Sequence, residues 1–283
     1  MVNWRPTPRA QSAKAALVGI VALVVGGLLA ASCSSSGIDG ANSSAPPNQN
    51  TSTTVAETTT VAPTTTLPPT TTTTKAWPKS PVAAIPAAGA VPVVSKIATT
   101  DPVVFLTIDD GMVRDPRVPE LLAQFKVPVT LFVNEGPYLA DPDFFLRVIA
   151  AGGSINSHTR SHKRLTSMSG SAQRNEICGM RDIIGQHVFV AGHFFRAPYG
   201  VSNGTTQTAA SSCGINAVLF WHASLNDGRV QYQQGGQLQP GDIVLTHFRD
   251  DLYDNIRALL WQCAIQGLTV APIEDYLPLP GDG

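Results

Sequence analysis

From about residue 92 onward, short β-rich apolar segments alternate with helical segments, and this alternation limits the fold more than any other feature of the sequence. The expected strands are 103–108, 127–133, 154–157, 188–195, 217–221, 243–246 and 268–271. The expected helices are 119–124, 142–151, 171–185, 205–213 and 252–266. Strands that alternate with helices form parallel α/β sheets or barrels. About seven strands in roughly 185 residues predict an α/β fold with a small or incomplete β/α barrel.

Chemically capable side chains follow the expected strands at the point where each strand ends. They are Asp109 and Asp110, His158, Arg196 and Tyr199, Trp221, and His247. In β/α barrels the carboxyl ends of the strands meet at one face, and active residues sit there. The sequence therefore predicts one site that is built from several strand ends.

His158 and His162 have the spacing of a metal-binding pair. Residues four apart on a helical turn share a face, so both imidazoles can reach one ion. A nearby carboxylate would complete a His₂Asp set with open positions for water, as in catalytic zinc sites. The spacing alone is weak evidence, but a carboxylate pair at a neighbouring strand end supports the metal site.

Asp109 and Asp110 are adjacent at a strand end, so their side chains are expected to point to opposite sides. Gly111 permits a sharp turn directly after them. One carboxylate can bind a metal, and the other can take a proton from a water whose pKa the metal lowers to about 7. The alternative is an Asp pair that caps the next helix.

His247 is the candidate general acid, because its near-neutral pKa lets it donate a proton to a leaving amine. Arg196 could orient the base carboxylate through a bidentate pair, and the backbone N–H of Tyr199 could help to bind an oxyanion. The alternatives are a structural hydrogen bond for His247 and a simple turn at residues 196–200.

Other chemistry finds no support in the sequence. There is neither a Gly-rich phosphate loop nor a Gly-x-Ser-x-Gly nucleophile motif. Trp221 and Leu245 are expected to line an apolar wall of the site. With 19 Lys and Arg against 20 Asp and Glu, the chain also lacks the basic excess of a nucleic-acid binder.

The first 32 residues have the layout of an export signal, in which basic residues precede an apolar stretch, here 15–31. The stretch ends Leu-Leu-Ala-Ala-Ser-Cys, which resembles a bacterial lipobox with Ala30 in place of the usual Leu. Cys33 would then carry the lipid. The alternative is an uncleaved single-span anchor, and either version places the rest of the chain outside the cytoplasmic membrane.

Residues 33–92 are expected to form a disordered tether. Between Thr51 and Thr74, 14 of 24 positions are Thr and three are Pro. Such a segment has too little apolar surface to offset its ordering entropy. The 43 residues from Ser34 to Ala76 would reach on the order of 130 Å as extended Pro-rich chain, so the tether would let residues 93–283 work within a cell wall at a distance from the membrane.

Three cysteines follow the tether: Cys178, Cys213 and Cys263. An odd number predicts one disulfide and one free thiol. The pair Cys178–Cys213 is favoured, because both residues fall in expected helices.

Taken in order, these residues resemble the polysaccharide deacetylases with a NodB homology domain, carbohydrate esterase family 4. The segments 106–111 (LTIDDG), 157–162 (SHTRSH), 195–200 (FRAPYG) and 245–247 (LTH) resemble the first, second, third and fifth family motifs. The resemblance covers essentially all of residues 93–280. It implies a distorted, incomplete β/α barrel and metal-dependent removal of N-acetyl, sometimes O-acetyl, groups from carbohydrate polymers.

The resemblance also implies a role for each matching residue. Asp109 would be the general base, and Asp110, His158 and His162 would hold a divalent metal, usually zinc, with cobalt or another ion as alternatives. Arg196 would orient the base, Tyr199 would supply a backbone oxyanion donor, Leu245 would line the acetyl pocket, and His247 would be the general acid.

The fourth family motif, commonly D-x-x-D-W, departs from the pattern. Ser224 takes the place of its first Asp and Gly228 that of its Trp, while Phe248 stands where an Asp often follows the acid His. In the family that first Asp usually supports the acid. Its loss is therefore expected to lower the pKa of His247 and to slow turnover.

The sequence thus predicts an exported, lipid-anchored, metal-dependent deacetylase that faces the cell wall. Its expected partners are a cell-wall glycan, with peptidoglycan amino sugars as the first candidate, and the membrane, without nucleic acid or an obligate protein partner. Two alternatives stay open: a weakly active or inactive glycan-binding wall lipoprotein, and an O-acetyl esterase of wall polysaccharide.

Overall fold

The computed structural model describes residues 89–189 and 192–277. The predicted signal segment 1–32, the lipidation candidate Cys33 and nearly all of the predicted tether lie outside these residues. Within the two ranges, no helix combines the length and the apolar character that crossing a membrane requires.

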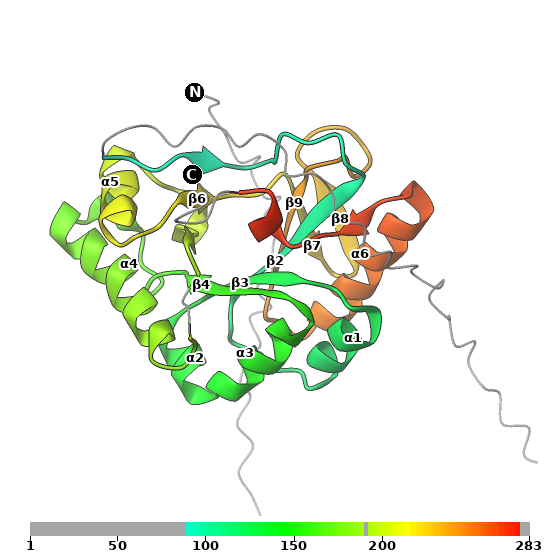
Figure 1. Ribbon diagram of the computed structural model, residues 1–283, viewed down its shortest axis with the longest axis horizontal. Coiled ribbons are helices and arrows are strands. Elements are labelled where there is room, and N and C mark those ends of the chain that lie inside the picture. The colour runs from blue at the N-terminus through cyan, green and yellow to red at the C-terminus, as the bar shows by residue number, and fades with distance from the viewer. Residues whose placement is uncertain (1–88, 190–191, 278–283) are drawn as a thin grey trace, which may run out of the picture. The chain divides into compact units, whose positions relative to one another are not determined.

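A curved, largely parallel sheet forms the centre of the fold, with helices around its outside (Figure 1). The strand order is β1-β6-β5-β4-β3-β2-β9-β7-β8, and β10 pairs with β2. The strands are β1 (Val93–Val94), β2 (Val103–Asp110), β3 (Val129–Val133), β4 (Gly153–Ser157), β5 (Phe194–Phe195), β6 (Ala217–Leu219), β7 (Ala223–Asn226), β8 (Arg229–Tyr232), β9 (Ile243–His247) and β10 (Thr269–Val270). The predicted incomplete β/α barrel is confirmed.

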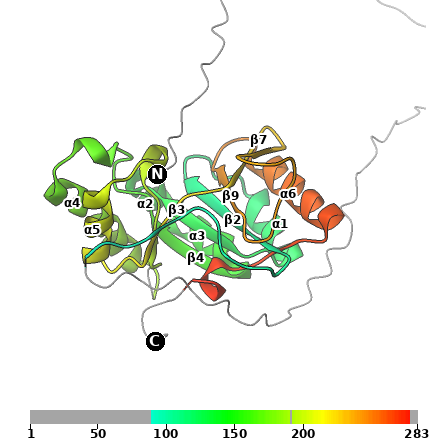
Figure 2. The same ribbon diagram turned by 90° about the horizontal axis from the view of Figure 1, so that it is seen from above.

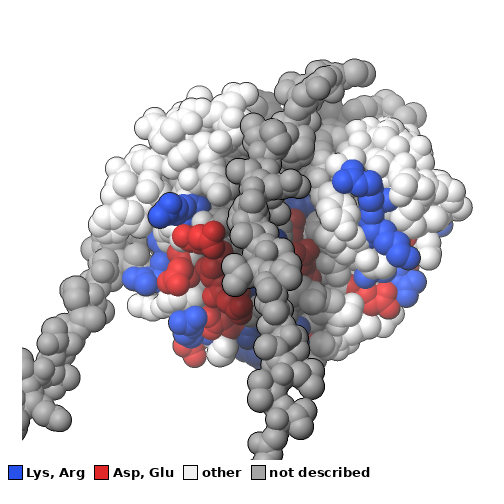
Figure 3. Space-filling model, turned by 180° about the vertical axis from the view of Figure 1, so that it is seen from behind, with Lys and Arg blue, Asp and Glu red and all other residues white. Residues whose placement is uncertain are grey.

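Six α-helices cover the outer face of the sheet in the described part of the chain. They are α1 (Arg117–Phe125), α2 (Glu135–Ala140), α3 (Pro142–Val148), α4 (Gly170–Gly185), α5 (Gly204–Ser212) and α6 (Leu252–Gln266). Both ribbon views place α4 and α5 at one side of the sheet and α6 at the other (Figures 1 and 2). On the face opposite that of Figure 1, acidic and basic side chains intermix, so their charges offset one another locally (Figure 3).

Alternating residues of β2 face two different apolar clusters. Val104, Leu106 and Ile108 pack with residues of the covering helices, whereas Val103 and Phe105 point inward and pack with an interior cluster that includes Phe132 and Phe194. Burial on both faces explains why β2 reads as a continuous apolar run. The same alternation places Asp109 on the inward face, above Phe105.

Several element boundaries differ from the prediction. Of the expected strand 188–195, the described residues that pair with neighbouring strands are Phe194 and Phe195, which form β5. The antiparallel hairpin β7–β8 was not predicted, although its turn, Asn226-Asp227-Gly228, carries a usual hairpin signal. Asp227 and Gly228 both have positive φ, 51° and 67°, as that turn requires. The strand β1 and the helix α2 were not predicted from the sequence either.

The predicted disulfide Cys178–Cys213 is confirmed and joins α4 to the residue that follows α5. Cys263 is a free, buried thiol of α6. Burial raises the pKa of Cys263 to about 12, so this thiol stays protonated and unreactive at neutral pH.

A buried carboxyl lies at the end of the barrel where β3 and β4 begin. Glu274, in the short 3₁₀ helix Ile273–Asp275, accepts hydrogen bonds from the hydroxyls of Ser154 and Thr130 through Oε1. Its other oxygen, Oε2, is buried without a hydrogen-bond partner among the described residues. Burial raises the pKa of Glu274, and the neighbouring Asp275 adds to the effect, while the two hydroxyl bonds oppose it.

The raised pKa of Glu274 predicts a specific pH dependence of stability. The folded chain binds this proton more tightly than the unfolded chain, so stability is lost as pH rises from the unfolded pKa through the folded pKa. Glu274→Gln removes the charge at similar volume. We expect it to raise the free energy of unfolding at pH 8 by on the order of 1 kcal/mol, with little gain at pH 4. Urea unfolding at the two pH values measures this, and an equal change at both would contradict it.

Candidate active site

Asp110, His158 and His162 converge at the carboxyl ends of β2 and β4. The Asp110 Oδ1 atom lies 3.5 Å from His158 Nε2 and 3.4 Å from His162 Nε2. One ligand atom from each residue falls within 4.8 Å of the others. Two imidazole nitrogens and one carboxylate oxygen match the ligands of a catalytic zinc site with open positions.

The hydrogen bonding of His158 suits a metal ligand. Its Nδ1 lies 2.8 Å from the carbonyl oxygen of Arg196, and a carbonyl can only accept, so Nδ1 carries the proton and Nε2 keeps its lone pair. Burial lowers the pKa of His158, against the opposing effect of the Asp109 and Asp110 carboxylates. The neutral imidazole, which is the form that binds metals, is therefore favoured.

Unusual backbone angles bring these ligands together. Asp110, Thr159, His162 and Tyr199 all have positive φ, with values of 80°, 71°, 53° and 63°. Such conformations cost about 1–3 kcal/mol each and persist only where surrounding contacts hold them. Four of the six non-glycine residues with positive φ in the described chain thus lie at this one site.

Two expectations about the ligands are corrected by this backbone. His158 and His162 do not lie on a helix, since residues 158–162 form an irregular loop, and the positive φ of Thr159 and His162 turns both rings to the same place. Asp109 and Asp110 do not point apart either. Asp109 Oδ2 and Asp110 Oδ1 lie 3.8 Å and 3.5 Å from His158 Nε2, because β2 leaves the extended conformation at Asp110.

Arg196 is fully buried and fixes Asp109. Its Nη1 donates to Asp109 Oδ1 and to the Thr107 hydroxyl, both at 2.8 Å. Its Nε and Nη2 donate to the carbonyls of Leu219 and Phe220, at 2.9 Å and 3.1 Å. The predicted bidentate pair is therefore wrong: these carbonyls take up the other donors, so a single nitrogen binds a single carboxylate oxygen. Asp109 Oδ2 remains directed toward His158.

His247 and Tyr199 lie on two other sides of this cluster. His247 is the register partner of Asp109 across β9 and β2, and burial lowers its pKa while Asp109 and Asp110 oppose the shift. The exposed ring of Tyr199 makes an edge-on contact with the ring of His162, 4.9 Å between centroids, and its hydroxyl donates to the His162 carbonyl at 3.2 Å. Behind this turn, a Cβ on Gly200 would come within 2.7 Å of Trp221.

Comparison with known proteins agrees with this arrangement. Residues 96–218 match the polysaccharide deacetylase family. An uncharacterised protein of Streptomyces coelicolor is 40% identical over 195 residues, which are 66% of this chain and 77% of that protein. The chitooligosaccharide deacetylase of Sinorhizobium fredii is 32% identical over 175 residues, 54% of this chain and 75% of that enzyme. This chain belongs to the polysaccharide deacetylase family.

Solved structures support the same fold. The chitin deacetylase of Colletotrichum lindemuthianum superposes with a TM-score of 0.60 at 18% identity, over 69% of this chain and 96% of that one. The match of residues 96–218 and the similarity to the Sinorhizobium fredii deacetylase confirm the predicted family, carbohydrate esterase family 4, and the predicted enzyme class, a carbohydrate deacetylase. His247, Trp221 and Leu245 lie beyond the segment 96–218 that matches the family.

The altered fourth motif of this polysaccharide deacetylase lies in the hairpin β7–β8. Ser224 pairs in register with Leu245 of β9, and its hydroxyl lies 3.4 Å from Gln231 Oε1 of β8. Phe248, in place of an Asp, is fully buried and packs against Phe145. Burial, rather than the missing carboxylate, is the largest cause that lowers the pKa of His247 in this structure.

Sequence reasoning missed two residues that hold the ligand loop, Asn134 and Glu176. Asn134 directly follows β3, so the strand-end rule that found the other residues would also have found it. Glu176 lies within α4 and accepts from the backbone N–H of Ser161 at 2.9 Å and from its hydroxyl at 2.6 Å. Nothing in the sequence pattern distinguishes Glu176 from a surface residue of that helix.

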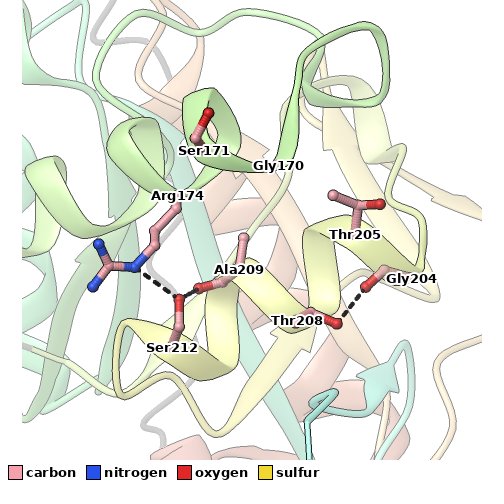
Figure 4. A pocket seen from close by; sticks show the side chains of 8 residues that line it. All are labelled: Gly170, Ser171, Arg174, Gly204, Thr205, Thr208, Ala209 and Ser212. Carbon is pink, nitrogen blue, oxygen red and sulfur yellow. Dashed lines mark hydrogen bonds between the residues drawn. The ribbon is translucent and has the colours of Figure 1, made fainter.

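A separate cleft of about 480 Å³ opens between α4 and α5 (Figure 4). Gly170, Ser171, Arg174, Gly204, Thr205, Thr208, Ala209 and Ser212 line it. Within it, Arg174 Nε donates to the Ser212 hydroxyl at 3.1 Å. The cleft contains none of the predicted site residues.

Proposed function

We propose that this chain hydrolyses the N-acetyl group of an amino sugar in a cell-wall glycan, with a divalent metal held by Asp110, His158 and His162. The proposal rests on one observation. A second carboxylate, that of Asp109, lies beside the three candidate ligands and is held in place by Arg196. Asp109 Oδ1 is tied to Arg196 at 2.8 Å, and Asp109 Oδ2 lies 3.8 Å from the ligand atom of His158.

The donor set fits zinc first and cobalt second, since two imidazoles and one carboxylate bind borderline divalent ions well. When bound, such an ion supplies a Lewis acid that polarises the acetyl carbonyl and makes water acidic enough to react at neutral pH. The protein contributes the orientation: the Arg196 carbonyl fixes the ring of His158, and Tyr199 packs against that of His162.

Asp109 acts as the general base in this proposal. Arg196 occupies Oδ1, so the proton of the attacking water goes to Oδ2. Asp109 is buried, with 2% of the residue's surface exposed, which keeps bulk water away from the reacting group.

His247 acts as the general acid and protonates the departing amine of the sugar. It stands beside Asp109 in the neighbouring strand, so base and acid flank one reaction centre. The backbone N–H of Tyr199 helps to hold the oxyanion. Leu245, which shares the inward face of β9 with His247, lines the acetyl pocket together with Trp221.

The substrate class rests on two supports. The similar enzyme of Sinorhizobium fredii is a chitooligosaccharide deacetylase, which acts on an oligomer of acetylated amino sugar. The export signal and the long Thr/Pro-rich tether would bring the domain to cell-wall glycan, of which peptidoglycan amino sugars are the first candidate.

Release of acetate tests the function directly. We expect the full chain with Zn²⁺ or Co²⁺ to release acetate from N-acetylated glycan fragments, and a chelator to abolish the release. O-acetylated fragments serve as the comparison substrate. Binding of fragments without acetate release, at full metal occupancy, would contradict the proposed deacetylase activity. It would favour the glycan-binding alternative that the replacement at Ser224 suggests.

Asp109→Asn tests the assignment of the base. The amide cannot accept the proton but keeps the size of the side chain, so we expect activity to fall by about 10²–10⁴-fold while Zn²⁺ still binds. Acetate release and zinc titration measure the two effects. Asp143→Asn, at an exposed carboxylate of α3, is the matched control and should leave both unchanged. An Asp109→Asn enzyme that stays active would refute the assignment of Asp109 as the general base.

Lipidation at Cys33 is tested by Cys33→Ala. Without the thiol no lipid can be attached, so we expect a labelled fatty acid supplied to the cells to be incorporated into the wild-type chain and not into the variant. Acetate release in solution should stay unchanged, because Cys33 lies outside the described domain. A wild-type chain that incorporates no label would favour the uncleaved span.

A further inference from the structure

We propose that Asn134 is a positioning residue that holds the three metal ligands in binding geometry before a metal arrives. The inference rests on the proposed metal site and concerns a residue outside the ligand set. Asn134 directly follows β3, and β3 lies between β2, which ends at Asp110, and β4, which leads to His158. Only 6% of the surface of Asn134 is exposed.

Asn134 bonds to the backbone on both sides. Its own N–H donates to the carbonyl of Asp110 at 3.2 Å. Its side-chain amide donates to the carbonyls of His158 and Thr159, at 2.7 Å and 2.9 Å. Both amide hydrogens are thus used, and one residue connects the segments that carry all three ligands.

These bonds act where the backbone is strained. Asp110 and Thr159 have φ of 80° and 71°, so both need outside contacts to persist. The Thr159 hydroxyl accepts from the backbone N–H of His162 at 3.0 Å. The turn that Asn134 fixes at Thr159 therefore sets the position of His162 as well.

The remaining contacts of the loop come from other residues. Glu176 holds Ser161 from α4, and Arg160 forms an ion pair with Glu135, which follows Asn134 in the chain. The Asn134 amide is the group that reaches the carbonyls of His158 and Thr159 themselves. Without this amide, both carbonyls would lose their hydrogen-bond donor. Binding of the metal itself would then have to order the ligands.

Asn134→Asp is the sharpest variant, because it keeps the shape and replaces the NH2 group, which makes both side-chain hydrogen bonds, by a carboxylate oxygen that repels both carbonyls. We expect the dissociation constant for Zn²⁺ to rise by about 10–100-fold, the range for residues that orient metal ligands. Asn134→Ala, which removes the donors without adding charge, should raise it by about 10-fold. Competition with a chromophoric chelator, on the full chain, measures both.

Asn255→Asp is the matched control. Asn255 is also buried, at 1% exposure, and its amide donates to the Thr246 hydroxyl and the Leu225 carbonyl, away from the metal ligands. It should lower the melting temperature of the metal-free chain as Asn134→Asp does, yet leave zinc affinity unchanged. Equal loss of affinity in both variants would mean that Asn134 contributes only general stability, which would overturn the proposal.

A second, metal-free measurement separates this inference from the proposed function. Amide hydrogen exchange of residues 158–162 in the apo chain should be about tenfold faster in Asn134→Ala than in wild type, and unchanged in Asn255→Asp. Unchanged exchange or unchanged zinc affinity in a folded Asn134 variant would overturn the inference. A wild-type chain that binds no zinc would instead refute the metal site, and the exchange comparison would still decide the role of Asn134.

Discussion

The buried guanidinium of Arg196 is the interaction on which the rest of the site depends. Its donors reach Asp109 and Thr107 of β2, the carbonyl of Leu219 at the end of β6 and that of Phe220 directly after it. The strands β2 and β6 are not neighbours in the sheet. A charge this deep is tolerated only when it is paired and fully hydrogen-bonded. Arg196 therefore joins the two halves of an open barrel across its interior, and the partner that makes this possible is the candidate base.

The interior below Arg196 explains why these polar groups behave as a unit. The guanidinium lies 4.3 Å above the ring of Phe132, and Phe105 and Phe194 fill the same inner cluster. This apolar floor separates the site from Glu274 at the other end of the barrel. In such surroundings hydrogen bonds and charge pairs are stronger than in water. The same burial that lowers the pKa of His158 also makes its bond to the Arg196 carbonyl an effective constraint.

The sequence predicted the strands and the residues at their ends, because both follow from local composition and from the geometry of parallel sheets. It did not predict how those residues meet. The positive φ of Asp110 and Thr159 occurs where tertiary contacts meet the backbone, among them the bonds from the backbone N–H and the side-chain amide of Asn134, and it has no local signal. Likewise, the single hydrogen bond from Arg196 to Asp109 follows from competition by backbone carbonyls that belong to a distant strand.

In the fourth motif, the local backbone conformation limits which residue type can occupy a chemically important position. Gly228 has φ of 67°, a conformation that the bulky Trp of the family pattern would adopt only under strain, and its N–H donates to Asn255 at 2.8 Å. Asn255 in turn bonds to Thr246, directly before His247. The hairpin thus has a tight turn at Gly228, and Ser224 stands where the family pattern has the carboxylate expected to support the proposed acid. His247 is then positioned through its strand, by pairing with Asp109 and by the bond from Asn255 to Thr246.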